Sequence, residues 1–61
     1  MNNSGHVTDI ECTVEHETER ACLLRNSHGD QAWFPKSQIE DNGDGTFTIP
    51  VWLLEQKEWE Y

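Results

Sequence analysis

Acidic and apolar residues alternate along one stretch near the start of the chain. Between residues 9 and 19 every odd position except 13 is acidic, the residues being Asp9, Glu11, Glu15, Glu17 and Glu19. The even positions in the middle of this stretch are Ile10, Cys12 and Val14. Because successive side chains of a β-strand point to opposite faces of a sheet, this period of two predicts a strand over residues 6–16. One face of the strand is expected to be apolar and buried, and the other to carry carboxylates into solvent.

Turn residues divide the next part of the chain into further short strands. A weak turn over residues 17–19 precedes a strand over 20–25, and a strong turn over 26–30 precedes a strand over 31–34. Pro35 ends that third strand, because proline cannot donate a hydrogen bond to a sheet ladder. Residues 36–41 are expected to form a short helical turn or an irregular crossing. The Asn-Gly-Asp-Gly run at 42–45 indicates a hairpin turn before a fourth strand over 46–49.

Residues 50–59 fit either a helix or a continued strand. Pro50 suits the first position of a helix, and residues 53–58 are mostly good helix formers. At helical spacing Trp52 and Trp59 share one side and are expected to pack onto the sheet. A short C-terminal helix is therefore favoured over a strand through residues 51–53. The expected fold is mainly β (α+β): a small curved antiparallel sheet or an SH3/OB-like half-barrel of about four strands, with that helix.

Length and composition set limits on this architecture. The 61 residues make one domain, expected over residues 6–61, after a flexible N-terminus at residues 1–5. Three Trp and two Phe supply a core that needs no metal, since each aromatic side chain buries roughly 150–250 Å².

The charge is strongly negative. Four Lys and Arg stand against twelve Asp and Glu, for a net charge of −8. This balance argues against direct binding to nucleic acid or to an anionic membrane, which both require a basic patch. With no signal segment and no apolar run of about 18 residues, the cytoplasm of a host bacterial cell is the expected location. Two meanings of the charge stay open, solubility alone or attraction to a cationic partner.

The sequence contains no recognisable catalytic or metal-binding signature. Cys12 and Cys22 lie in strand-like runs and are expected to be free and buried, with a bridge as the alternative if the two strands pair in a suitable register. No Cys or His pair has zinc-finger spacing. Residues 40–51 resemble a calcium-binding loop only in part, because position 12 of such a loop needs Glu and here is Val51. We therefore expect no enzyme, no metal and no cofactor.

Two motifs carry a resemblance. Residues 33–40 read Trp-Phe-Pro-Lys-Ser-Gln-Ile-Glu, and residues 49–54 read Ile-Pro-Val-Trp-Leu-Leu. Over residues 17–57 the chain resembles small bacterial proteins of phage and prophage type with the pattern W-h-P-K-S-Q-I followed by I-P-x-W-L. The resemblance implies a mobile-element origin and a compact module of sheet and helix, but no particular activity. The chain departs from the pattern at Leu54, where alanine is usual, and in its acidic tail over residues 58–61.

The first motif also has two physical interpretations. Trp33 or Phe34 is expected to face the core, and a strand-to-turn device that ends at Pro35 is favoured. The alternative is a docking loop formed by Trp33, Lys36 and Gln38.

The carboxylate stripe leads to a hypothesis of function. Like charges on one sheet face repel, and a basic partner would relieve that repulsion. We expect a non-enzymatic inhibitor or modulator of phage type, anti-CRISPR-like in size and charge, that binds a basic surface of a host nucleic-acid-handling or defence protein. The expected partner-binding residues form two zones: Asp9, Glu11, Glu15, Glu17 and Glu19 in the first, and Glu58, Trp59, Glu60 and Tyr61 in the second. The alternative is a structural or adaptor module, able to form a homodimer, that uses a strand edge and the Trp-rich C-terminus.

Overall fold

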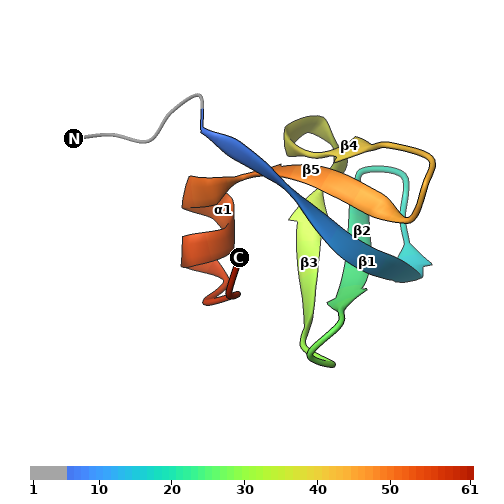
Figure 1. Ribbon diagram of the computed structural model, residues 1–61. Coiled ribbons are helices and arrows are strands. Elements are labelled where there is room, and N and C mark those ends of the chain that lie inside the picture. Colours follow the sequence, from blue (N-terminus) through green and yellow to red (C-terminus); the bar gives the residue numbers. More distant parts are fainter. Residues whose placement is uncertain (1–5) are drawn as a thin grey trace.

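The computed structural model describes residues 6–61 as one open antiparallel sheet with a short C-terminal helix (Figure 1). The strands are β1 (Val7–Glu17), β2 (Ala21–Asn26), β3 (Gln31–Pro35), β4 (Glu40–Asp41) and β5 (Thr46–Pro50). A single 3₁₀ turn spans Lys36–Gln38, and the helix α1 spans Val51–Gln56. The mainly β fold with a C-terminal helix is thus confirmed, while the flexible terminus expected at residues 1–5 lies outside the described residues.

The long strand β1 is the centre of the sheet. The strand order is β3-β2-β1-β5-β4. The first half of β1, from Val7 to Glu11, pairs with β5, and its second half, from Cys12 to Glu17, pairs with β2. In Figure 1 β1 and β5 run across the direction of β2 and β3, so β1 joins two differently oriented parts of the sheet. An additional strand, β4, forms where a helical turn or an irregular crossing was expected. It pairs with β5 through Glu40 and Asp41.

A β-bulge at Glu15 interrupts the alternation of β1. Val14 lies opposite Leu24, but His16 lies opposite Leu23, so Glu15 is an extra residue in the strand. A bulge of this kind places two residues of one strand against one residue of its partner and bends the strand. Beyond it, Glu17 lies opposite the buried residue Cys22 and therefore points to the same face as the core residues.

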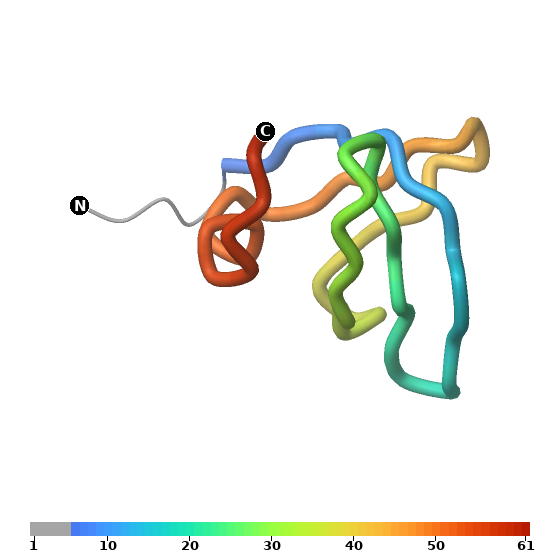
Figure 2. The backbone as a smooth tube through the Cα atoms, turned by 90° about the horizontal axis from the view of Figure 1, so that it is seen from below, coloured from blue at the N-terminus to red at the C-terminus, as the bar shows by residue number. Residues whose placement is uncertain are grey.

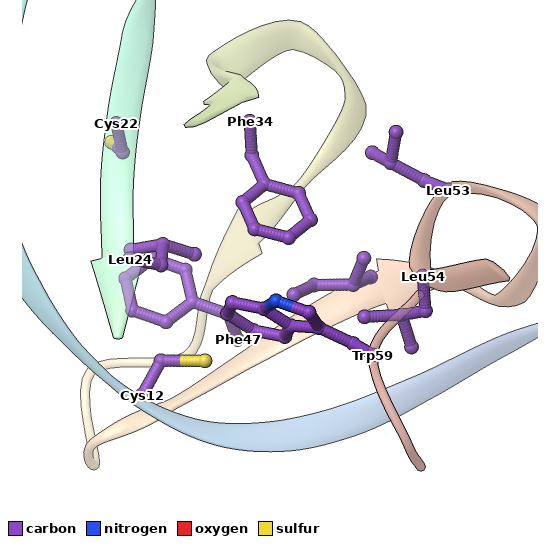
Figure 3. Packing of buried hydrophobic residues seen from close by; sticks show 9 residues of the cluster. Cys12, Cys22, Leu24, Phe34, Phe47, Leu53, Leu54 and Trp59 are labelled. Atoms are coloured by element: carbon purple, nitrogen blue, oxygen red, sulfur yellow. The ribbon is translucent and has the colours of Figure 1, made fainter. Parts of the chain in front are cut away.

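The core lies between the inner face of the sheet and α1. Its buried members are Cys12, Cys22, Leu24, Phe34, Phe47, Ile49, Leu53, Leu54 and Trp59. Figure 3 shows Phe34 and Trp59 in the middle of this cluster, with Cys22 and Leu24 on one side and Leu53 and Leu54 on the other. The Phe34 and Trp59 rings meet edge to face, with centroids 5.0 Å apart, a favourable aromatic geometry. Phe34, not Trp33, is thus the core residue of β3.

Both cysteines are free and buried. The register places Cys12 opposite Asn26 and Cys22 opposite Glu17, so neither sulfur faces the other across the strands. The expectation of free, buried thiols is confirmed, and the disulfide alternative is not what the fold contains.

The helix turns a different side to the core than its spacing predicts. Leu53 and Leu54 are buried, whereas the side chain of Trp52 is 41% exposed. The prediction that Trp52 packs onto the sheet is therefore wrong. The adjacent pair Leu53 and Leu54 fills the space over β5, which is the strand that α1 follows directly.

Trp59 reaches the core because of the way in which α1 ends. The N–H of Trp59 donates to the carbonyl of Leu54 at 2.9 Å, and the N–H of Glu58 to that of Glu55 at 3.1 Å. These bonds form a Schellman motif, whose turning residue has a left-handed conformation and is usually glycine. Here it is Glu58, with φ of 63°. The reversal directs Trp59 inward, beside Leu53 and Leu54.

No helix in residues 6–61 is both long and apolar enough to cross a membrane.

Candidate interaction surface

Candidate residues gather on the outer face of the sheet, the face opposite the hydrophobic core. The register places three rows of side chains there: Glu40, Thr48 and Asp9; Gln31, Arg25 and Thr13; and Trp33, Leu23 and His16. All of these side chains are exposed except Thr48 and Leu23, which are half-buried. Because α1 packs on the opposite face, the outer face is open to a partner.

The acidic stripe of β1 is divided between two faces of the sheet. Asp9 and Glu11 lie on the outer face, opposite Thr48 and Thr46 of β5. Glu17 lies on the inner face because of the bulge, and Glu19 follows the end of β1 in the turn before β2. The single carboxylate ladder that the alternation predicts is therefore not present, although each of these acids is exposed.

Two of these acids are neutralised within the chain. Glu15 accepts a hydrogen bond from Nε of Arg25 at 2.7 Å, and Oε1 of Glu17 lies 3.0 Å from Nζ of Lys36. The same Oε1 accepts a weak hydrogen bond from the Cys22 thiol at 3.9 Å. Internal cations thus relieve much of the repulsion that the sequence predicts for the second half of β1.

A different kind of environment surrounds Asp9. The hydroxyl of Thr48 donates to Oδ1 of Asp9 at 2.7 Å, and Nδ2 of Asn42 lies 3.1 Å from both the Thr46 and Thr48 hydroxyls. The Thr46 hydroxyl in turn donates to Oδ1 of Asp44 at 2.6 Å, and this bond holds the pKa of Asp44 below its usual value. Neutral donors therefore hold these carboxylates in place without cancelling their charge.

The acids at this side of the sheet form what we call the acidic end. Its members are Asp9, Glu11, Glu40 and Asp44; Asp41 is not one of them, because it lies opposite the buried Phe47 and so points to the inner face. The chain segments that carry them, residues 6–19 and 37–56, contain no Lys or Arg. The four cations of the chain all belong to β2, the turn before it, the start of the 3₁₀ turn and the end of α1. Charge is thus separated along the sheet, in a way that the composition alone does not reveal.

The predicted second zone, the C-terminal tail, is only partly at the surface. Trp59 is 4% exposed, so the prediction that it packs onto the sheet is confirmed, and its place as an exposed anchor of the second zone is wrong. Glu60 lies 3.7 Å from His28 in the turn between β2 and β3, and the Tyr61 hydroxyl donates to Glu55 at 2.7 Å. The tail therefore meets the sheet at the β2–β3 turn and leaves Glu58, Glu60 and Tyr61 exposed.

Trp33 is the aromatic residue of the outer face. Its side chain is 42% exposed and meets His16 edge to face, with centroids 6.0 Å apart. The alternation of side chains along the strands could have identified it. Cys22, Leu24 and Phe34 point to the inner face of β2 and β3, so Leu23 and Trp33, which alternate with them, point to the outer face.

Cys12 lies at the junction between the two halves of β1. Burial and the neighbouring Glu11 carboxylate raise the pKa of its thiol to about 11. Because the thiolate is the reactive form of cysteine, this residue is not a nucleophile at neutral pH.

Comparisons with known proteins add no assignment. Neither a scan against protein-family models nor searches of curated proteins and of solved structures gave a match.

Proposed function

We propose that this protein is a non-catalytic binding module that docks the outer face of its sheet onto a cationic surface of another protein. The observation that carries the proposal is the acidic end, where four carboxylates lie on segments without Lys or Arg. The net charge of −8 adds long-range attraction, which raises the rate of association with a basic partner.

The class of partner that we favour is a nucleic-acid-handling protein, including the defence complexes that bacteria direct against phage. Such proteins carry Lys and Arg in surfaces that bind phosphate oxygens. Carboxylates that are held in a row, as Asp9 and Glu40 are on either side of Thr48, offer negative oxygens to the same donors. Inhibition would follow from occupation of that surface.

The edges of the sheet support the adaptor alternative less well. Strand β4, at one edge, is two residues long. At the other edge, β3 has α1 and the C-terminal tail on the side away from β2, as Figures 1 and 2 both show. The outer face therefore offers a partner more accessible surface than either edge.

Paired charge reversals test the proposal. The variant Glu11→Lys/Glu40→Lys changes two exposed acids of the acidic end, and Glu19→Lys/Glu58→Lys makes the same change in net charge outside it. Tagged wild-type protein and both variants are used to capture bacterial proteins at about 0.05 and 0.5 M salt, a range over which the screening length falls about threefold. The captured proteins are quantified by mass spectrometry.

We expect a basic nucleic-acid-handling protein that the wild type retains at low salt, that high salt releases, and that only the acidic-end variant loses. Equal loss with both variants would show that net charge alone attracts the partner. Equal retention with both would show that the acidic end is not the binding surface. Either of these results contradicts the proposal.

A further inference from the structure

The far side of the outer face, away from the acidic end, carries a row of apolar and aromatic side chains. His16, Leu23 and Trp33 lie directly opposite one another on β1, β2 and β3. Pro35 follows two residues after Trp33 on the same face and is exposed as well. We call these four residues the aromatic row. A sheet face that combines such a row with a separate acidic end has two chemically different contact areas.

No Lys or Arg of the described residues lies against the ring of Trp33. Among residues 6–61 the recorded cation–π contact is that of Lys57, whose Nζ lies 5.7 Å from the centre of the buried Phe34 ring. The nearest cation on the outer face by register is Arg25, one row away, and its guanidinium is held by Glu15. Within residues 6–61 the exposed indole of Trp33 meets the edge of His16 but no Lys or Arg, and the overall charge of the molecule attracts cations.

Arginine is the side chain that best fits both the exposed indole of Trp33 and the carboxylates of the acidic end. Its planar guanidinium stacks on aromatic rings and also binds carboxylates in a forked geometry, whereas the lysine ammonium is a compact and strongly hydrated charge. Tryptophan is the best partner for such cation–π stacking. Tryptophan and arginine are also the residues that most often dominate the energy of protein interfaces.

We propose that the aromatic row is an anchor for an arginine side chain of the partner, so that Trp33 stacks on a guanidinium while the acidic end binds neighbouring cations. This inference rests on the proposed function and adds the chemical identity of the anchor. It predicts that the surface prefers arginine-bearing segments over lysine-bearing segments of equal charge.

The experiment uses two synthetic probes, octa-arginine and octa-lysine, both acetylated and amidated, on the full chain at about 0.05 M salt. The chain offers a matched control, because Trp33 and Trp52 are 42% and 41% exposed, but only Trp33 lies on the outer face. Dissociation constants are measured for the wild type, Trp33→Ala, Trp33→Tyr and Trp52→Ala. Circular dichroism and thermal melts establish that each variant is folded, and sedimentation of the free protein over a concentration series reports self-association.

We expect the wild type to bind octa-arginine about two- to fivefold more tightly than octa-lysine, the range that an exposed cation–π contact supplies. Trp33→Ala should reduce that preference to what the carboxylates of the acidic end alone supply, Trp33→Tyr should keep most of it, and Trp52→Ala should leave it unchanged.

Three results would overturn the inference, and each is distinguishable from the others. Equal affinity for the two peptides, with no effect of Trp33→Ala, would reject the anchor but leave the acidic-end proposal standing. Self-association that Trp33→Ala abolishes would assign the aromatic row to a second copy of the chain. No measurable binding of either peptide would reject the anchor and the proposed function together.

Discussion

The two halves of β1 have similar sequences and different surroundings. In the first half Asp9 accepts a hydrogen bond from the hydroxyl of Thr48, a neutral donor. In the second half Glu15 and Glu17 are paired with Arg25 and Lys36. The same alternation of acidic and apolar residues therefore produces a negative surface at one end and nearly neutral pairs at the other.

The difference arises from the strands that pair with each half. The first half faces β5, which supplies threonines and no charge, and the second half faces β2, which supplies Arg25. Which carboxylates remain available to a partner is thus decided by the neighbouring strand and not by the acidic strand itself. A charge pattern along one strand is weak evidence for a binding surface until its cross-strand neighbours are known.

The largest expected difference between the two halves of β1 is in how much the packing around each half contributes to the free energy of unfolding. On the inner face Ile10 lies opposite Phe47, which is 5% exposed, whereas Val14 lies opposite Leu24 but is itself 42% exposed. Phe47→Ala should lower the free energy of unfolding by about 3–5 kcal/mol, through lost burial and the cavity that remains. Val14→Ala should lower it by less than about 1 kcal/mol.

Urea denaturation monitored by tryptophan fluorescence measures both changes. Because a domain of this size has roughly 3–9 kcal/mol of stability at about 0.05–0.15 kcal/mol per residue, Phe47→Ala is expected to lose a large share of it. Equal losses for the two variants would show that the helix side of the sheet covers both halves of β1 alike, against the burial described above.

The junction between the halves should show a dependence on alkaline pH. The pKa of Cys12 is raised to about 11 in the folded state, so the folded protein holds this proton more tightly than the unfolded chain does. Its contribution to stability is complete below the ordinary thiol pKa and is lost as the pH rises toward 11. The loss should be on the order of 1 kcal/mol, less than the whole shift implies, because the site is close to solvent.

Thermal melts of the wild type and of Cys12→Ala between pH 8 and pH 11 isolate this contribution, since all other groups titrate in both proteins. The wild type should lose more stability than the variant over this range. Parallel curves would show that the thiol has an ordinary pKa. Alkylation of the native protein at pH 7.5 should also be slow at both cysteines, because burial raises the pKa of Cys22 as well.

Much of the fold follows from local signals, and the candidate surface follows from them less well. Four of the five strands, the turns at residues 26–30 and 42–45 and the C-terminal helix could be predicted from alternation, turn residues and helix propensity, whereas the two-residue strand β4 could not. The bulge at Glu15 could not, because it depends on the register with β2 and leaves no mark on the alternation. For the same reason the inward turn of Glu17 and its pairing with Lys36 could not be read from the sequence.

The C-terminal tail shows a second limit of sequence reasoning. Local propensity does not favour glutamate in the left-handed conformation that Glu58 adopts, so the sharp end of α1 gave no signal. The burial of Trp59 against Phe34 supplies the stabilisation that offsets this strain. Helical spacing predicts that Trp59 packs onto the sheet, but not the reversal at Glu58 that directs it there. The outer-face aromatic, Trp33, lies in a segment that also fits a structural turn.

The smallest expected effects concern the two kinds of contact that β1 acids make, an ion pair at Glu15 and a hydrogen bond from a neutral hydroxyl at Asp9. A double-mutant cycle on Glu15 and Arg25, using Glu15→Gln and Arg25→Gln, should give a coupling of about 0.2–1 kcal/mol, as is usual for exposed ion pairs. A second cycle, with Asp9→Ala and Thr48→Val, should give about 0.5–1.5 kcal/mol, since one partner is a neutral hydroxyl. Urea denaturation at about 0.05 and 0.5 M salt distinguishes them: the first coupling should shrink at high salt because screening weakens charge pairs, and the second should change little. If both couplings shrink equally, the acids of the first half depend on long-range charge as much as those of the second. That result would contradict the conclusion that the carboxylates of the first half are held by neutral hydrogen-bond donors and not by cations.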